Sequence, residues 1–90
     1  MKKAIITVGG KDTVGIIARV CTYLAENRVN ILDISQTIVQ DYFNMMMIVD
    51  IGNMTGEYGD MVDDLERLGR EIGVAVKCQK EEIFDQMHRI

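Results

Sequence analysis

The chain has 90 residues, of which 48% are hydrophobic and 27% charged, and it contains no proline. This composition is typical of one folded domain and excludes a disordered segment. The formal net charge is −4, with lysines and arginines scattered along the chain, so the protein should on average repel nucleic acid. No apolar run approaches the roughly 20 residues of a membrane span, and no signal peptide precedes the first strand pattern, so we expect a cytoplasmic protein without a membrane partner.

The first two elements differ in hydrophobic period. Residues 4–8 are a short apolar run rich in β-branched side chains, which predicts a strand that ends at Gly9-Gly10. From Thr13 to Asn27 the apolar residues recur every three or four positions, which predicts an amphipathic helix. Either Asp12 or Thr13 can cap the start of this helix with a side-chain oxygen.

Two further strands follow in a hairpin pattern. Residues 29–39 predict a second strand whose apolar positions change parity, and a bulge or a strong twist near Asp33 would explain that change. Gln40-Asp41-Tyr42 fits a turn. Strict alternation then predicts a third strand with five core-facing side chains, Phe43, Met45, Met47, Val49 and Ile51.

The last part of the chain predicts a helix, a strand and another helix. In residues 57–72 the apolar side chains form one helical stripe, and Gly73 suits the C-terminal position of that helix. Residues 74–78 alternate as a fourth strand. Residues 81–90 place Ile83, Phe84, Met87 and Ile90 on one side, which predicts a short final helix.

The order of elements predicts the fold class. Strand, helix, strand, strand, helix, strand with right-handed crossovers gives an α+β, ferredoxin-like βαββαβ domain, with both helices on one face of a four-stranded antiparallel sheet. We expect this domain to span residues 1–80. Residues 81–90 would form a helical extension packed on the domain or on a neighbouring subunit.

The glycine-bearing turn from Gly9 to Gly15 is the most informative local feature. Such a turn before a helix exposes backbone amides that favour a carboxylate or phosphate, and the missing side chain of Gly15 lets a ligand or a second chain come close. The alternative is that the glycines only form the turn and Asp12 only caps the helix.

The turn and the second strand together resemble the ACT domain family. The residues that carry the resemblance are Asp12-x-x-Gly15, an amphipathic helix ending in Leu24 and Asn27, and Asn30-Ile31 at the start of a strand. The family's small-ligand regulatory domains have an Asp-x-Pro-Gly turn and an Asn-Ile strand start, and here Val14 stands where proline is common. The resemblance covers nearly the whole chain. It is strongest to short stand-alone single-ACT proteins of bacteria, and the chain is also similar to the ACT halves of the glycine cleavage repressor.

The resemblance implies a homodimer with an amino acid or similar carboxylate at the subunit interface. Two chains would pair through the strand that begins at Asn30 and form a continuous eight-stranded sheet. The assembly would be this homodimer or a higher homo-oligomer. One subunit would supply backbone contacts from the turn, and Asn30 and Ile31 would meet the ligand from across the interface or beside it. The turn residues are Asp12, Thr13, Val14, Gly15 and Ile16.

A partner surface is also indicated by the third strand itself. Met46 and Ile48 should point away from both helices and would be left in water unless something covers them. The apolar side of residues 81–90 is the candidate cover, from the same chain or from a neighbour.

Other activities lack the residues that they require. Consecutive Met45, Met46 and Met47 point to alternate faces and cannot converge on a copper ion, and the single histidine, His88, has no second histidine or cysteine nearby. Cys21 and Cys78 lack metal or redox spacing and are expected to pack as buried free thiols. RNA-binding modules, copper chaperones and acylphosphatases share the predicted fold, but the chain lacks the residues that each requires. An RNA-binding module needs aromatic side chains on the sheet and a basic surface. A copper chaperone needs a Cys-x-x-Cys loop, and an acylphosphatase needs an arginine in its phosphate-binding loop.

The sequence therefore predicts a binding module without catalytic residues, metal or cofactor. The leading hypothesis is an amino-acid-responsive regulatory homodimer whose state is sensed by a partner protein. The alternative is a ligand-free oligomerisation or protein-interaction domain that uses the same interface.

Overall fold

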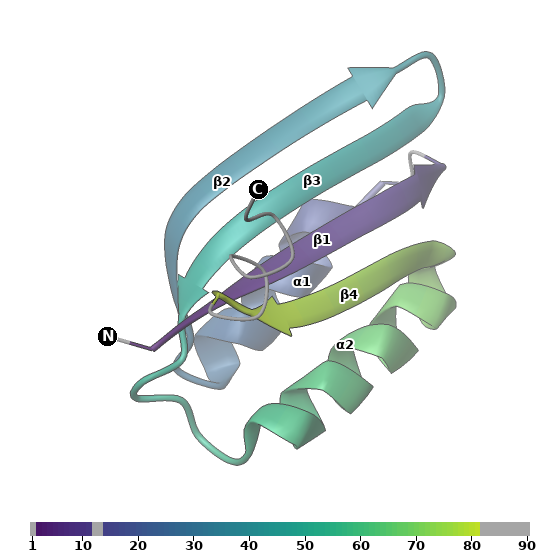
Figure 1. Ribbon diagram of the computed structural model, residues 1–90. Coiled ribbons are helices and arrows are strands. Elements are labelled where there is room, and N and C mark those ends of the chain that lie inside the picture. The colour runs from purple at the N-terminus through teal and green to yellow at the C-terminus, as the bar shows by residue number, and fades with distance from the viewer. Residues whose placement is uncertain (1, 12–13, 82–90) are drawn as a thin grey trace.

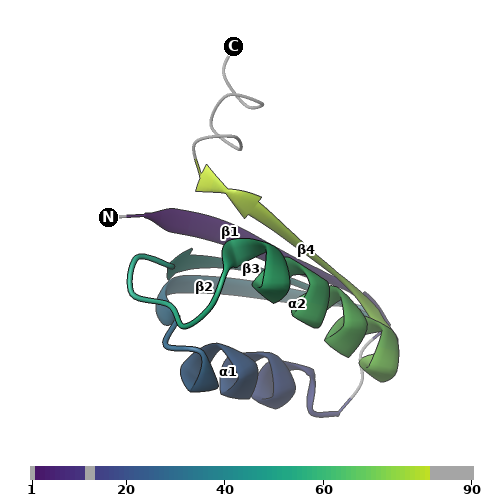
Figure 2. The ribbon, with the colours of Figure 1, turned by 90° about the horizontal axis from the view of Figure 1, so that it is seen from below.

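The computed structural model describes residues 2–11 and 14–81 and has the predicted ferredoxin-like architecture (Figure 1). The four strands form one antiparallel sheet in the order β2-β3-β1-β4. Both helices cover the same face of this sheet, and the other face carries no described helix (Figure 2). The elements are β1 (Lys3–Lys11), α1 (Ile16–Glu26), β2 (Asn30–Val39), β3 (Tyr42–Asp50), α2 (Tyr58–Ile72) and β4 (Val74–Lys80).

The glycines that were expected to end the first strand belong to it. Gly9 pairs with Asn44 and Gly10 with Phe43, so β1 continues to Lys11. A side chain at either glycine would crowd its neighbours, because a Cβ at Gly10 would lie 3.1 Å from the Cα of Val74. These glycines therefore serve close strand packing as well as the approach to the turn.

Helix α1 begins three residues later than predicted. Its N-cap is Gly15, which has a left-handed backbone with φ of 90° and has no side chain of its own to cap the helix. The N-cap residue is therefore Gly15, not Asp12 or Thr13, and the expected side-chain cap by those two residues lies outside the described part of the chain. Gly15 takes the N-cap because a left-handed φ suits glycine and strains other residues.

The hairpin of β2 and β3 has the predicted irregularity. The register shifts between Ile31 and Asp33, which confirms the expected bulge and explains the change of parity along β2. A two-residue turn, Gln40-Asp41, joins the strands, and Gln40 has a φ of 56°.

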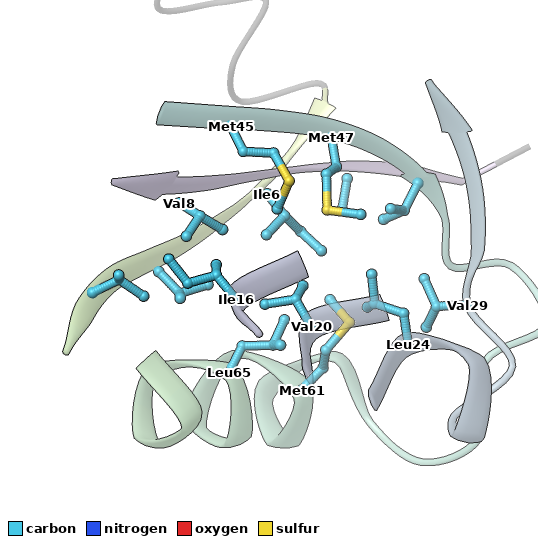
Figure 3. Close-up of a cluster of buried hydrophobic side chains, with 14 of the residues drawn as sticks. Ile6, Val8, Ile16, Val20, Leu24, Val29, Met45, Met47, Met61 and Leu65 are labelled. Carbon is cyan, nitrogen blue, oxygen red and sulfur yellow. The ribbon is translucent and has the colours of Figure 1, made fainter. Parts of the chain in front are cut away.

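The core lies between the sheet and the two helices. All five side chains predicted to face it from the third strand are buried, with at most 8% exposed, although the last of them, Ile51, lies just after β3. Met45 and Met47 point towards the helices, where they meet Val20 and Leu24 of α1 and Met61 and Leu65 of α2 (Figure 3). Met45 and Met47 are therefore core residues, as their alternation predicted.

Helix α2 packs closely on β4 at one glycine. A Cβ at Gly69 would lie 2.7 Å from the carbonyl oxygen of Val74, so only glycine allows this approach. Gly73 ends the helix in the left-handed conformation, as predicted, with φ of 93°.

Polar contacts tie the two helices to each other. The Tyr23 hydroxyl donates a hydrogen bond of 2.7 Å to the Asp64 carboxylate, and Arg19 pairs with Glu71 at 3.0 Å. Neither of the helices in residues 2–11 and 14–81 has the length and apolar character required to cross a membrane.

Candidate functional site

The described part of the β1–α1 turn offers backbone groups and little side-chain chemistry. Val14 is fully exposed, whereas the Ile16 side chain is buried in the core, so Ile16 can offer a ligand only its backbone. The first amides of α1 have no side-chain cap at Gly15, and they carry the positive end of the helix dipole. Space around Gly15 is open, because a Cβ there would meet no atom within 4 Å. Asp12 and Thr13, the other predicted contacts, lie outside the described residues.

The second half of the predicted site begins β2. Asn30 pairs with Asp50 of β3 and is exposed, and Ile31 pairs with Val49 and packs partly against the core. The Asn30 side chain can both donate and accept hydrogen bonds. Asn30 therefore meets the requirements of a polar ligand contact, and Ile31 those of an apolar one.

Within one copy, the two halves lie at opposite ends of the sheet (Figure 1). Gly10, next to the turn, is level with Phe43 of β3, whereas Asn30 is level with Asp50. Seven strand residues separate these levels, which at the usual rise amounts to about 24 Å. A single copy therefore does not bring the turn and Asn30 to one ligand.

An exposed apolar surface runs along β2, the strand at one edge of the sheet. Ile34 and Ile38 pair with the core-facing Met47 and Phe43, yet they are 43% and 55% exposed. Leu32 at the bulge is also exposed. Pairing of two chains through this strand was predicted, but only its first two residues, Asn30 and Ile31, were predicted as contacts. The order β2-β3-β1-β4, which is part of the predicted fold, would have identified β2 as an edge strand whose apolar side chains lack cover.

Two hollows lie elsewhere on the molecule. One, of about 390 Å³, lies on the helix-free face over Thr7, Gly9, Ser35, Thr37, Asn44 and Lys77. The other, of about 560 Å³, lies at the start of α2 and is lined by charged side chains, among them Lys2, Lys3, Lys80 and Glu81. Of the described residues predicted to contact a ligand, Val14, Gly15, Ile16, Asn30 and Ile31, none lines either hollow.

The thiols and acids of the described residues do not form a reactive centre. Cys21 and Cys78 are free and partly buried, less than the full burial expected. Burial raises the pKa of the Cys78 thiol to about 12, so this thiol stays protonated near neutral pH. Across residues 2–11 and 14–81, no three His, Cys, Asp or Glu side chains gather as metal ligands.

Comparison with known proteins bears on the resemblance seen in the sequence. The family model described as ACT domain matches residues 2–79. A UPF0237 protein of Bifidobacterium longum is 67% identical over 90 residues, which cover both chains completely. Among solved structures, an ACT domain protein from Streptococcus pneumoniae has a TM-score of 0.81 and 39% identity, over 93% of this chain and 94% of that one. A putative glycine cleavage system transcriptional repressor has a TM-score of 0.70 and 21% identity, over 88% of this chain and 45% of its own.

Proposed function

This chain belongs to the ACT domain family, and from that membership we propose that it is a regulatory homodimer that binds an amino acid or a similar small carboxylate. The ligand lies at the interface of two copies, and a partner protein in the cytoplasm senses its presence. The observation that carries this proposal is the separation of about 24 Å between the turn and Asn30 within one copy. A site that uses both must draw them from two copies.

Antiparallel pairing of two β2 strands would bring the two halves together. If the two-fold axis passes the middle of β2, Asn30 of one copy lies opposite Val39 of the other. Val39 pairs with Tyr42, and Tyr42 pairs with Lys11, so Val39 is level with the residues that lead into the turn. The Asn30 of each copy would then lie at the same end as the turn of the other.

The exposed apolar side chains of β2 support this pairing. An edge strand of ten residues offers unpaired backbone groups to a second strand. Ile34 and Ile38, which α1 and α2 leave exposed, would be covered by the second copy.

The chemistry of the two halves favours a small zwitterion. The first amides of α1 suit a carboxylate, because Gly15 has no side chain to occupy them, and the side-chain oxygen of Asn30 can accept a hydrogen bond from an ammonium group. The fully exposed Val14 offers an apolar contact. We place the turn residues 12–16 around the ligand from one copy, and Asn30 and Ile31 from the other.

A thermal-shift screen against the standard amino acids tests the ligand. A ligand at a hundred times its dissociation constant adds about 2.7 kcal/mol of stability, which in a domain of this size raises the melting temperature by roughly 15 °C. The substitution Val14→Glu should abolish the shift, because it sets a negative charge beside the bound carboxylate, whereas Val14→Thr should largely keep it. If no amino acid or related small carboxylate shifts the melting temperature, ligand sensing is wrong.

Sedimentation velocity tests the pairing. Ile38→Asp sets a charge on the β2 edge and should convert the dimer to monomer. Ala75→Asp adds the same charge to an exposed position on β4, the other edge strand, and should leave the dimer intact. A dimer that survives Ile38→Asp would show that the copies pair elsewhere.

A dimer without any ligand is the second candidate function. It is favoured by Val14, since the family's turn commonly has proline there and a more flexible turn loses more entropy on binding. A chain that sediments as a β2-paired dimer and shows no thermal shift would be an oligomerisation or protein-interaction domain.

A further inference from the structure

The helix-free face of the sheet has an apolar centre. Ile5 of β1 lies between Ile48 of β3 and Gln79 of β4, and Met46 lies one row along the same face. Met46 is 41% exposed and Ile48 partly exposed, which leaves apolar surface in the middle of this face. These three residues, Ile5, Met46 and Ile48, are called the open-face patch below.

Ile5 indicates that the β1 side of this patch is covered in the folded protein. It is 5% exposed, yet it does not belong to the core cluster between the sheet and the helices. No element within residues 2–11 and 14–81 packs over the helix-free face (Figure 2). An isoleucine in the centre of an open face needs apolar neighbours above the sheet to leave water.

The segment after β4 has the composition that such a cover requires. Residues 82–90 lie outside the described part of the chain, and their sequence places Ile83, Phe84, Met87 and Ile90 at helical spacing. The intervening residues are polar or charged. A segment of nine residues with one apolar side is too short to be stable as a helix by itself, so it must pack on a surface.

We propose that residues 82–90 cover the open-face patch of their own chain. The path from the end of β4 to the patch is short. Lys80 pairs with Ala4, which is next to Ile5 in β1. The Glu81 carboxylate lies 3.9 Å from the ammonium group of Lys3, two residues before Ile5. Nine residues in a helix extend about 13 Å, and three strand spacings from β4 to β2 amount to about 14 Å. The segment can therefore cross the sheet above Ile5, Ile48 and Met46.

The direct covalent connection favours the same chain over a second copy. A short tether gives a local concentration in the millimolar range, which an untethered copy does not reach at ordinary protein concentrations. Charge is also complementary, because the exposed Lys77 lies on this face and Glu82 and Asp85 lie among the polar residues of the segment. Exposed pairs of this kind add little affinity, but they favour this orientation.

Methyl NMR on the full-length protein tests the proposal. With methyl groups of isoleucine and methionine labelled, the proposal predicts nuclear Overhauser effects from Met46 and Ile5 to Ile83 and Met87. These signals should persist, relative to the core signal between Ile6 and Met47, when labelled protein is diluted tenfold with unlabelled protein and the copies are allowed to exchange. Signals that fade by about tenfold on dilution would assign the cover to a second copy and overturn the proposal, as would the absence of these signals.

A pair of matched variants checks that the apolar side is responsible. Phe84→Ser with Met87→Ser should remove the signals from Ile83 to Met46 and speed hydrogen exchange at Thr7 and Met46. Gln86→Ser with Arg89→Ser, which changes two polar residues of the same segment, should keep both. The core signal between Ile6 and Met47 reports whether each variant is folded. If the apolar variant is folded and its signals are unchanged, residues 82–90 do not cover the patch through this side.

Discussion

Two glycines of α2 allow one substitution to be compared at two sites of the same helix. Gly69 lies in the interior of α2, and a Cβ there would be 2.7 Å from the Val74 carbonyl oxygen and 2.8 Å from the Val76 Cγ2. Alanine gains about 1 kcal/mol of helix propensity over glycine, but overpacking against a strand backbone costs about 3 kcal/mol. Gly69→Ala should therefore lower the free energy of unfolding by about 2 kcal/mol, or roughly 10 °C in melting temperature.

Gly59→Ala is the control for this prediction. Gly59 lies in the first turn of α2, and a Cβ there would meet no atom within 4 Å. Only the propensity term remains, so the free energy of unfolding should rise by about 0.5 kcal/mol. Urea denaturation followed by circular dichroism, at one protein concentration, measures both variants. A Gly69→Ala protein as stable as the wild type would refute the close α2–β4 contact.

Leu65, the hydrogen bond between Tyr23 and Asp64, and the Cys78 thiol give the remaining predictions. Leu65→Ala empties a fully buried position between the helices and the sheet and should cost about 2–5 kcal/mol in urea denaturation. Tyr23→Phe removes the hydrogen bond to Asp64 and should cost about 1 kcal/mol, with little further loss in the Tyr23→Phe, Asp64→Asn double variant. Because burial raises the pKa of Cys78 from 9.0 to about 12 in the folded chain, stability should fall as pH rises from about 9 to 12. At about pH 8, iodoacetamide should modify folded Cys78 on the order of a thousandfold more slowly than the unfolded chain, as measured by mass spectrometry; equal rates would contradict the burial.

The fold could be predicted because its periodicities are regular. Strict alternation from Phe43 to Ile51 identified five core-facing side chains, and the apolar stripe predicted in residues 57–72 is the face of α2 on which the buried Met61 and Leu65 lie. The ends of β1 and α1 were less predictable, because Gly9 and Gly10 have turn composition but pair with β3. Tertiary packing against Val74 decides the conformation there, and a local pattern does not contain that information.

The candidate site was only partly accessible from the sequence. Gly15 and Asn30 were singled out from the resemblance to ACT domains, but their distance apart depends on the strand register, which needs the structure. That register is what makes a second copy necessary for a site that uses both. The exposed Ile34 and Ile38 were missed as interface residues, because an apolar residue in an alternating strand indicates burial and does not distinguish an edge strand from an inner one.

Mixing two binding-deficient variants tests most directly whether the site is shared between copies. Val14→Glu damages the turn and Asn30→Ala damages the β2 contact, so each homodimer should fail to bind the amino acid found in the thermal-shift screen. After the two are mixed and allowed to exchange, each heterodimer regains one intact site, made from the unchanged turn of one copy and the unchanged Asn30 of the other. Calorimetric titration should then recover about a quarter of the wild-type sites, as random pairing of equal amounts requires. If mixing restores no binding, the turn and Asn30 do not meet across the interface, and the account is contradicted.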